Sequence, residues 1–170
     1  MGKKELSTEL GSAIEKWADE GLESIGVFKN KSPEYERFKK QIIAQLRSLY
    51  TDKAIDLFLR AKDNRRIEAP DGFARITGPC GDTMEIFLKT NNSIIIDSSF
   101  QTDGCQPSIA AGGMVAEMVK GKNIDEIRNY TQQDVLDSLG GLPDDHKHCA
   151  LLAINTLKEA IDNFYKKNKN

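Results

Sequence analysis

One stretch decides the fold. It covers residues 73–105 and reads FARITGPCGDTMEIFLKTNNSIIIDSSFQTDGC. Apolar and polar residues alternate over residues 83–90, which is the pattern of a strand with one buried face. A shorter strand is expected at residues 73–77, and a returning strand at residues 93–102 follows a hairpin turn at Asn91-Asn92. The stretch therefore predicts a three-stranded antiparallel meander.

Helical patterns flank this meander on both sides. Before it, apolar residues recur at helical spacing, and Ser32-Pro33 marks a helix start. After it, a helix is expected over residues 108–120 behind Pro107, and further helices follow to the end of the chain. We expect an α+β fold, with a helical N-terminal extension over residues 1–49 and a sheet-containing domain over residues 50–170.

The composition excludes several classes of protein. The 170 residues carry a net charge of −2, so the chain lacks the basic footprint of a nucleic-acid-binding protein. Hydrophobic residues make up 39% and charged residues 29%, which suits a packed core rather than disorder. No stretch approaches the ~20 apolar residues that span a bilayer, and the start lacks the apolar segment of a signal peptide. We expect a cytoplasmic protein that binds neither nucleic acid nor membrane.

All three cysteines lie next to breaks in the predicted elements. Cys80 stands in the loop Gly78-Pro79-Cys80-Gly81-Asp82, Cys105 precedes the helix that opens at Pro107, and Cys149 falls in the first turn of the last helix. An odd number of cysteines argues against a disulfide framework, and leaves metal ligation, redox or nucleophilic chemistry, or plain burial. Because helix N-termini favour anions, we expect a lowered pKa for the thiols of Cys105 and Cys149.

Two further side chains are candidates for the same site. Asp82 lies two residues after Cys80, and His148 is adjacent to Cys149. Residues two apart point to different sides of a helix, so we do not expect His146 and His148 to share one metal. We favour His148 as the ligand and expect His146 to be a supporting or solvated residue. A lone cysteine usually only packs, and an Asp after Gly commonly closes a turn, but their joint placement favours a site. Three thiolates, one imidazole and one carboxylate suit zinc or an iron–sulfur cluster.

Three separate motifs, in the right order, resemble the iron–sulfur cluster assembly scaffold family of the NifU N-terminal or IscU type. They are Gly78–Asp82, Phe100–Cys105 and Leu142–Cys149. Tyr50–Asp56 and Val119–Lys122 are also similar to that family, so the resemblance covers about two thirds of the chain. It implies a SufE/NifU-like α+β domain, in which a small antiparallel sheet is covered by helices.

The resemblance also implies a function and a set of ligands. The chain would be a carrier and not an enzyme. It would take sulfur as persulfide from a cysteine desulfurase, build a labile [2Fe–2S] cluster with iron, and pass it to apo iron–sulfur acceptor proteins. Cys80, Cys105 and Cys149 would match the family's essential cysteines, and Cys149 its main persulfide acceptor. Asp82 and His148 would be accessory ligands, with the choice of fourth ligand left open between them.

One motif departs from the family and one alternative function remains. The family's usual Leu-Pro-Pro-Val-Lys stretch reads Leu-Pro-Asp-Asp-His over residues 142–146. We therefore do not expect recognition by a dedicated Hsp70-type chaperone. The alternative is a zinc-binding sulfur acceptor that activates a cysteine desulfurase, because zinc suits the same ligands. Three cysteines together with Asp82 favour the scaffold, and the sequence leaves open a monomer or a homodimer.

Overall fold

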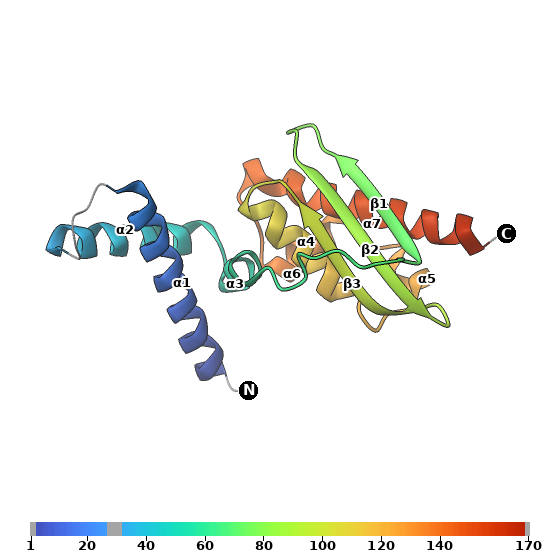
Figure 1. The fold of residues 1–170 in the computed structure, drawn as a ribbon, viewed down its shortest axis with the longest axis horizontal. Helices are drawn as coiled ribbons and strands as arrows, with labels where there is room; N and C mark the ends of the chain where they lie inside the picture. The colour runs from blue at the N-terminus through green and yellow to red at the C-terminus, as the bar shows by residue number, and fades with distance from the viewer. Residues whose placement is uncertain (1–2, 27–31, 169–170) are drawn as a thin grey trace.

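The computed structural model describes residues 3–26 and 32–168. Within these ranges the chain forms one small sheet, with helices before and after it (Figure 1). The elements, in chain order, are α1 (Lys3–Ile25), α2 (Pro33–Leu49), α3 (Asp52–Arg60), β1 (Gly72–Thr77), β2 (Thr83–Asn91), β3 (Ile94–Thr102), α4 (Gln106–Val119), α5 (Ile124–Ile127), α6 (Gln132–Leu139), the 3₁₀ turn η1 (Asp144–His146) and α7 (Lys147–Asn168).

The sheet is an antiparallel meander with strand order β1-β2-β3, which confirms the predicted α+β fold. Thr77 of β1 pairs with Thr83 of β2, and Met84 of β2 pairs with Thr102 of β3. The end of β1, the start of β2 and the end of β3 therefore lie at the same end of the sheet. This end carries the loop of Cys80 and the segment that leads to Cys105.

The second hairpin turns one residue later than the sequence suggested. Asn91 still pairs with Ile94, and the left-handed backbone falls on Asn92 (φ 49°) and Ser93 (φ 64°). A two-residue turn with two positive φ angles matches the right-handed twist of the strands that it joins. The predicted turn at Asn91-Asn92 is wrong by one residue, because Asn91 completes the strand ladder.

Two helices cover one face of the sheet. α4 packs on β3, α7 packs on β1 and β2, and the two helices contact each other (Figure 1). A Cβ atom at Gly112 of α4 would lie 2.5 Å from the ring of Phe100, so glycine allows the close approach of this helix. The chain after α3 covers the free edge of β3, since the Phe100 N–H donates to the carbonyl of Asp63 at 2.9 Å.

The N-terminal extension contributes to the main core. Leu10 and Ile14 of α1 and Leu46 of α2 belong to the same buried cluster as α3 and the inner face of the sheet. The outer part of α2 projects away from the sheet (Figure 1). A division into an extension at residues 1–49 and a domain at residues 50–170 stays a prediction.

A buried ion network holds α1 against α2. Lys39 is only 7% exposed, and its Nζ lies 2.5 Å from the Glu15 carboxylate and 2.9 Å from that of Asp19. The Tyr35 hydroxyl donates to Asp19 at 2.6 Å. The hydrogen bond to Glu15 raises the pKa of Lys39 against the opposing effect of burial. The charge is therefore paired where an unpaired ammonium would be costly.

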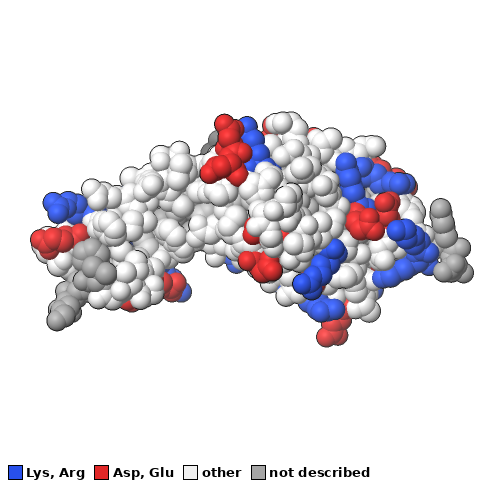
Figure 2. All heavy atoms as spheres, turned by 90° about the horizontal axis from the view of Figure 1, so that it is seen from above, with Lys and Arg blue, Asp and Glu red and all other residues white. Residues whose placement is uncertain are grey.

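The surface carries charges of both signs. On the face shown in Figure 2, basic and acidic side chains lie next to one another in several places, with uncharged surface between them. This arrangement agrees with the small net charge of −2. Among the described residues, no helix is long and apolar enough to cross a membrane.

Candidate metal centre

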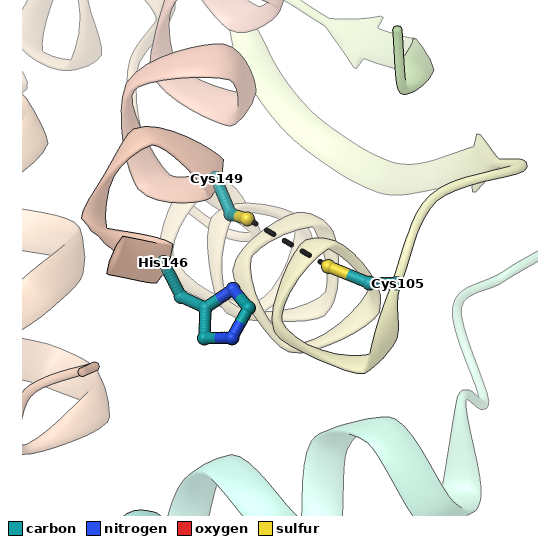
Figure 3. A group of neighbouring side chains, drawn as sticks. All are labelled: Cys105, His146 and Cys149. Carbon is teal, nitrogen blue, oxygen red and sulfur yellow. Dashed lines mark hydrogen bonds between the residues drawn. The ribbon is translucent and has the colours of Figure 1, made fainter. Parts of the chain in front are cut away.

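Two cysteines and a histidine meet where α4 and α7 begin. Cys105 is the N-cap residue of α4, and Cys149 lies in the first turn of α7. Their Sγ atoms are 3.9 Å apart. Ligand atoms of Cys105, His146 and Cys149 all lie within 4.8 Å of one another, and the imidazole of His146 faces the two sulfurs (Figure 3). The contact between the two helices thus brings together thiols that are 44 residues apart.

The three members of this group differ in exposure. Cys105 is exposed, His146 is half-buried and Cys149 is completely buried. Cys149 is inaccessible because it lies on the face of α7 that packs against the core. A reagent or ion that approaches from solvent therefore meets Cys105 first.

The expected lowering of the Cys149 pKa is wrong. Burial, the nearby Cys105 and the Asp82 charge raise the pKa of the Cys149 thiol to about 12, and a hydrogen bond with Ser108 only partly opposes them. The helix N-terminus favours a thiolate, but removal of the thiol from water penalises the charged form more. Without a cation, Cys149 is a neutral thiol at neutral pH.

Asp82 connects the Cys80 loop to the start of α4. Its Oδ2 atom accepts a hydrogen bond from the Ser108 hydroxyl at 2.7 Å and another from the Cys105 N–H at 3.3 Å. A Cβ atom at Gly104 would lie 2.4 Å from the same oxygen, so glycine makes room for the carboxylate. Asp82 thus places a negative charge at the N-terminus of α4, in addition to any role as a ligand.

Cys80 stands apart from the other two thiols. It is exposed, in a turn closed by hydrogen bonds from Gly81 N–H to the Gly78 carbonyl at 3.0 Å and from Gly78 N–H to the Asp82 carbonyl at 2.8 Å. Neither Cys80 nor Asp82 belongs to the group whose ligand atoms lie within 4.8 Å of one another. The five predicted residues therefore lie at the same end of the sheet, but only Cys105 and Cys149 of this set are preassembled with His146.

Both histidines flank Cys149. His148 Nε2 is 3.6 Å from the Cys149 sulfur, and the two imidazole centroids are 6.4 Å apart. The argument that set His146 aside assumed one continuous helix. His146 instead lies in the 3₁₀ turn η1, immediately before α7 begins. The choice of His148 as a ligand stays a prediction, while His146 is a residue that the sequence reasoning passed over.

Two more residues border the site and were missed. Ser108 is fully buried, and its hydroxyl lies 3.7 Å from the Cys105 sulfur. Tyr50 is the C-cap residue of α2. Burial raises the pKa of its hydroxyl, and negative charge at Cys105 or Cys149 raises it further. Ser108 could have been found from its place three residues after Cys105 in the first turn of the same helix, whereas nothing local points to Tyr50.

The donors fit a thiophilic metal. Two sulfurs and one imidazole nitrogen are ligands that zinc and iron–sulfur chemistry use. Fold and site together define an α+β protein that presents cysteine ligands at one end of a three-stranded meander, where two helices start. The chain belongs to the NifU-like N terminal domain family, whose model matches residues 49–170.

Curated relatives agree with this assignment. The chain is 40% identical over 121 residues to the iron–sulfur cluster assembly scaffold protein IscU 1 of Archaeoglobus fulgidus, which covers 71% of this chain and 79% of that protein. It is 39% identical over 121 residues to the scaffold protein IscU of Aquifex aeolicus, with 69% and 77% covered. The nitrogen fixation protein NifU of Nostoc sp. is 36% identical over 124 residues, with 68% and 41% covered.

Solved structures share the fold. A NifU-like protein (N-terminal) from Brucella abortus superposes with a TM-score of 0.57 at 18% identity, over 72% of this chain and 98% of that one. A putative iron–sulfur cluster assembly scaffold protein for the SUF system, from Fervidobacterium islandicum, gives 0.53 at 20% identity, over 66% and 96%. The helix-covered meander is therefore the fold of this family.

Proposed function

We propose that this protein is a scaffold on which an iron–sulfur cluster is assembled before transfer to apo acceptor proteins. The observation that carries the proposal is the position of the three family motifs. They converge at the end of the sheet where α4 and α7 begin, in a chain that is 40% identical to a named IscU scaffold. The cluster is the cargo of such a protein, and we propose the [2Fe–2S] form.

Each site residue has a proposed role in handling this cargo. Cys80, Cys105 and Cys149 would bind the cluster, with Asp82 or His148 as the further ligand. Cys149 is the proposed persulfide acceptor, in which its thiolate attacks the outer sulfur of the desulfurase persulfide and the desulfurase thiolate leaves. Reduction of that sulfur to sulfide takes two electrons from a separate electron-transfer protein. Since Cys149 is buried, the role requires that desulfurase binding uncover it.

The protein would act as a carrier and not as an enzyme. Its proposed partners are a cysteine desulfurase and apo iron–sulfur proteins, in the cytoplasm, without a dedicated Hsp70-type chaperone. A monomer and a homodimer are both compatible with the proposal. None of these roles involves nucleic acid or a membrane.

A second candidate is favoured by the preassembled donors. Two sulfurs and an imidazole suit zinc, so the protein could act as a zinc-binding sulfur acceptor that activates a desulfurase. Such an acceptor would need only one reactive cysteine, whereas the scaffold needs all three cysteines. The two candidates differ in which metal supports their activity.

The deciding experiment is anaerobic reconstitution with ferrous iron and a sulfide or desulfurase source, followed by absorption spectroscopy and metal analysis. The scaffold predicts visible charge-transfer bands, with iron and sulfide in equal amounts. These bands should disappear in single serine variants of Cys80, Cys105 and Cys149. A colourless protein that holds only zinc, yet accelerates a desulfurase, would instead support the activator.

A further inference from the structure

Cys105 and Cys149 form a pair of thiols where α4 and α7 begin. Their Sγ atoms are 3.9 Å apart, and Figure 3 shows the two sulfurs facing each other from the two helices. We propose that Cys105 is the resolving thiol for a persulfide on Cys149, so that the pair supplies the two electrons that convert the transferred sulfur into sulfide. This inference rests on the proposed function, because it takes Cys149 as the persulfide acceptor.

The proposed step is a thiol–disulfide exchange within one chain. The Cys105 sulfur attacks the Sγ atom of Cys149, and the bond from this atom to the outer sulfur of the persulfide breaks. The outer sulfur keeps its own hydrogen, takes up the proton of the Cys105 thiol and leaves as H₂S. A disulfide between Cys105 and Cys149 remains, so the pair is oxidised by two electrons and the sulfur is reduced by two. The electron-transfer protein of the proposed function then reduces the disulfide to the two thiols.

The two sulfurs need to move only a short distance to react. A disulfide bond is about 2.05 Å long, so a separation of 3.9 Å must shorten by about 1.9 Å. Cys105 is exposed and is the N-cap residue of α4, so rotation about its Cα–Cβ bond moves the sulfur without displacing the helix. Cys149 is fully buried in the core cluster on α7, and its sulfur is held in place by packing. The exposed thiol therefore approaches the buried one.

Ser108 orients the Cys105 thiol for this attack. The Ser108 hydroxyl donates its one hydrogen to Asp82 at 2.7 Å, so only its oxygen lone pairs remain for the Cys105 sulfur, 3.7 Å away. The Cys105 S–H is therefore the donor in that contact, and the lone pairs of its sulfur are left for Cys149. Because Ser108 is fully buried, water does not compete for this arrangement.

Cys80 is less suited to resolve the persulfide. It is exposed on its own turn and lies outside the group whose ligand atoms are within 4.8 Å of one another. Attack by Cys105 on the outer sulfur would not involve Cys80 either. It would only move the persulfide to Cys105, where Cys149 resolves it to the same disulfide. Cys80 is thus a matched control within the same chain.

The experiment is a single turnover of the metal-free, reduced full-length chain under anaerobic conditions. The sulfur donor is a cysteine desulfurase that already carries its persulfide and has been freed of L-cysteine and other thiols. One equivalent of cysteine persulfide serves as the donor in a parallel arm. The released H₂S is measured, and disulfides and persulfides are located by alkylation and peptide mass spectrometry. The wild type should release about one H₂S per chain and form the disulfide between Cys105 and Cys149.

Serine variants separate the resolving thiol from the other cysteines. Cys105→Ser should keep the persulfide on Cys149 and release H₂S at least about tenfold more slowly, because the neighbouring nucleophile is lost. Cys80→Ser should release H₂S at the wild-type rate. A wild-type chain that keeps its persulfide, or equal rates for Cys105→Ser and wild type, would overturn the proposal. Circular dichroism checks that the variants fold, and the disulfide in the wild type tests the proposal even if Cys105→Ser does not.

The test can fail separately from the proposed function, because it uses no iron and forms no cluster. Disulfide formation with cysteine persulfide, but no sulfur transfer from the desulfurase, would support the resolving role of Cys105 and count against the desulfurase as the sulfur source. A cluster that assembles on a chain in which no disulfide forms would support the scaffold and overturn the resolving role.

Discussion

Asp82 has a structural role that can be separated from any role as a metal ligand. Its Oδ2 atom accepts hydrogen bonds from the buried Ser108 hydroxyl at 2.7 Å and from the Cys105 N–H at 3.3 Å. Alanine at position 82 removes both the acceptor and the charge. Asparagine keeps an acceptor oxygen of similar reach and removes only the charge. The two variants should therefore differ in stability before any metal is added.

The contacts of Asp82 set the expected difference in unfolding free energy between the two variants. In Asp82→Ala the buried hydroxyl of Ser108 loses its acceptor, at a cost of about 1–3 kcal/mol. The Cys105 sulfur, 3.7 Å from that hydroxyl, is only a weak substitute. Loss of a negative charge beside the N-terminus of α4 adds about 0.3–1 kcal/mol. We expect a loss of about 2 kcal/mol for Asp82→Ala and about 0.5 kcal/mol for Asp82→Asn.

The assay is thermal and urea unfolding of the metal-free proteins in the presence of a chelator, followed by circular dichroism. For a chain of this length the expected loss corresponds to a decrease in Tm of about 4–8 °C for Asp82→Ala and about 1–2 °C for Asp82→Asn. Equal stability of Asp82→Ala and wild type would refute the structural role. Equal destabilisation by the two substitutions would show that the charge, and not the hydrogen bonds, is what matters.

The same pair tests the proposed effect of Asp82 on the cluster. If the carboxylate makes the bound cluster labile, both variants should retain a reconstituted cluster longer than wild type under a chelator challenge. Faster loss of the cluster from Asp82→Asn than from wild type would contradict this effect. Loss from Asp82→Ala alone would instead be explained by the weakened start of α4.

Two further predictions concern packing and pH. Gly104→Ala places a Cβ atom 2.4 Å from an Asp82 oxygen, and urea unfolding should show a loss of about 1–3 kcal/mol. Gly11→Ala is the control, since its Cβ meets nothing within 4 Å and should stabilise the helix by about 0.5–1 kcal/mol; equal effects would contradict the close contact. Burial opposes ionisation of Glu117, but hydrogen bonds from two lysines prevail and lower its pKa below 4.5. The ionised Glu117 carboxylate contributes its full stabilisation above pH 4.5, and this contribution is lost as the pH falls through the lowered pKa. The free energy of unfolding of Glu117→Gln should therefore depend less steeply on pH in acid than that of wild type. Identical pH slopes for the two proteins would contradict this prediction.

Patterns that depend on neighbouring residues were predictable from the sequence. The Ser32-Pro33 helix start occurs as expected, and the alternation of β2 holds except at Phe87, which lies in the polar phase of the pattern and is nevertheless buried. They are local because backbone hydrogen bonds and side-chain caps within a few residues determine them. The meander also follows, since short turns join adjacent antiparallel strands.

The details of the site depend on contacts between distant segments, and these were harder to predict. Helical spacing could not locate His146 beside the sulfurs, because a 3₁₀ turn changes the direction of its side chain before α7 begins. The raised pKa of Cys149 results from packing between α7 and α4, which outweighs the effect of the helix terminus. The hydrogen bond from Ser108 to Asp82 joins residues 26 positions apart. Only Pro143, which precedes the turn, hints at the irregular start of α7.

The structure also supplies a physical reason why a cluster on this scaffold would be released. Clusters held by four thiolates are the common durable form, and this chain has three cysteines, so a cluster bound by one chain needs a non-thiolate ligand. If Asp82 is that ligand and binds iron through Oδ2, this oxygen gives up the hydrogen bonds from Ser108 and the Cys105 N–H. The opposing cost of about 2 kcal/mol would weaken retention of the cluster by about 30-fold. Stability of the start of α4 and retention of the cluster would then compete for one carboxylate.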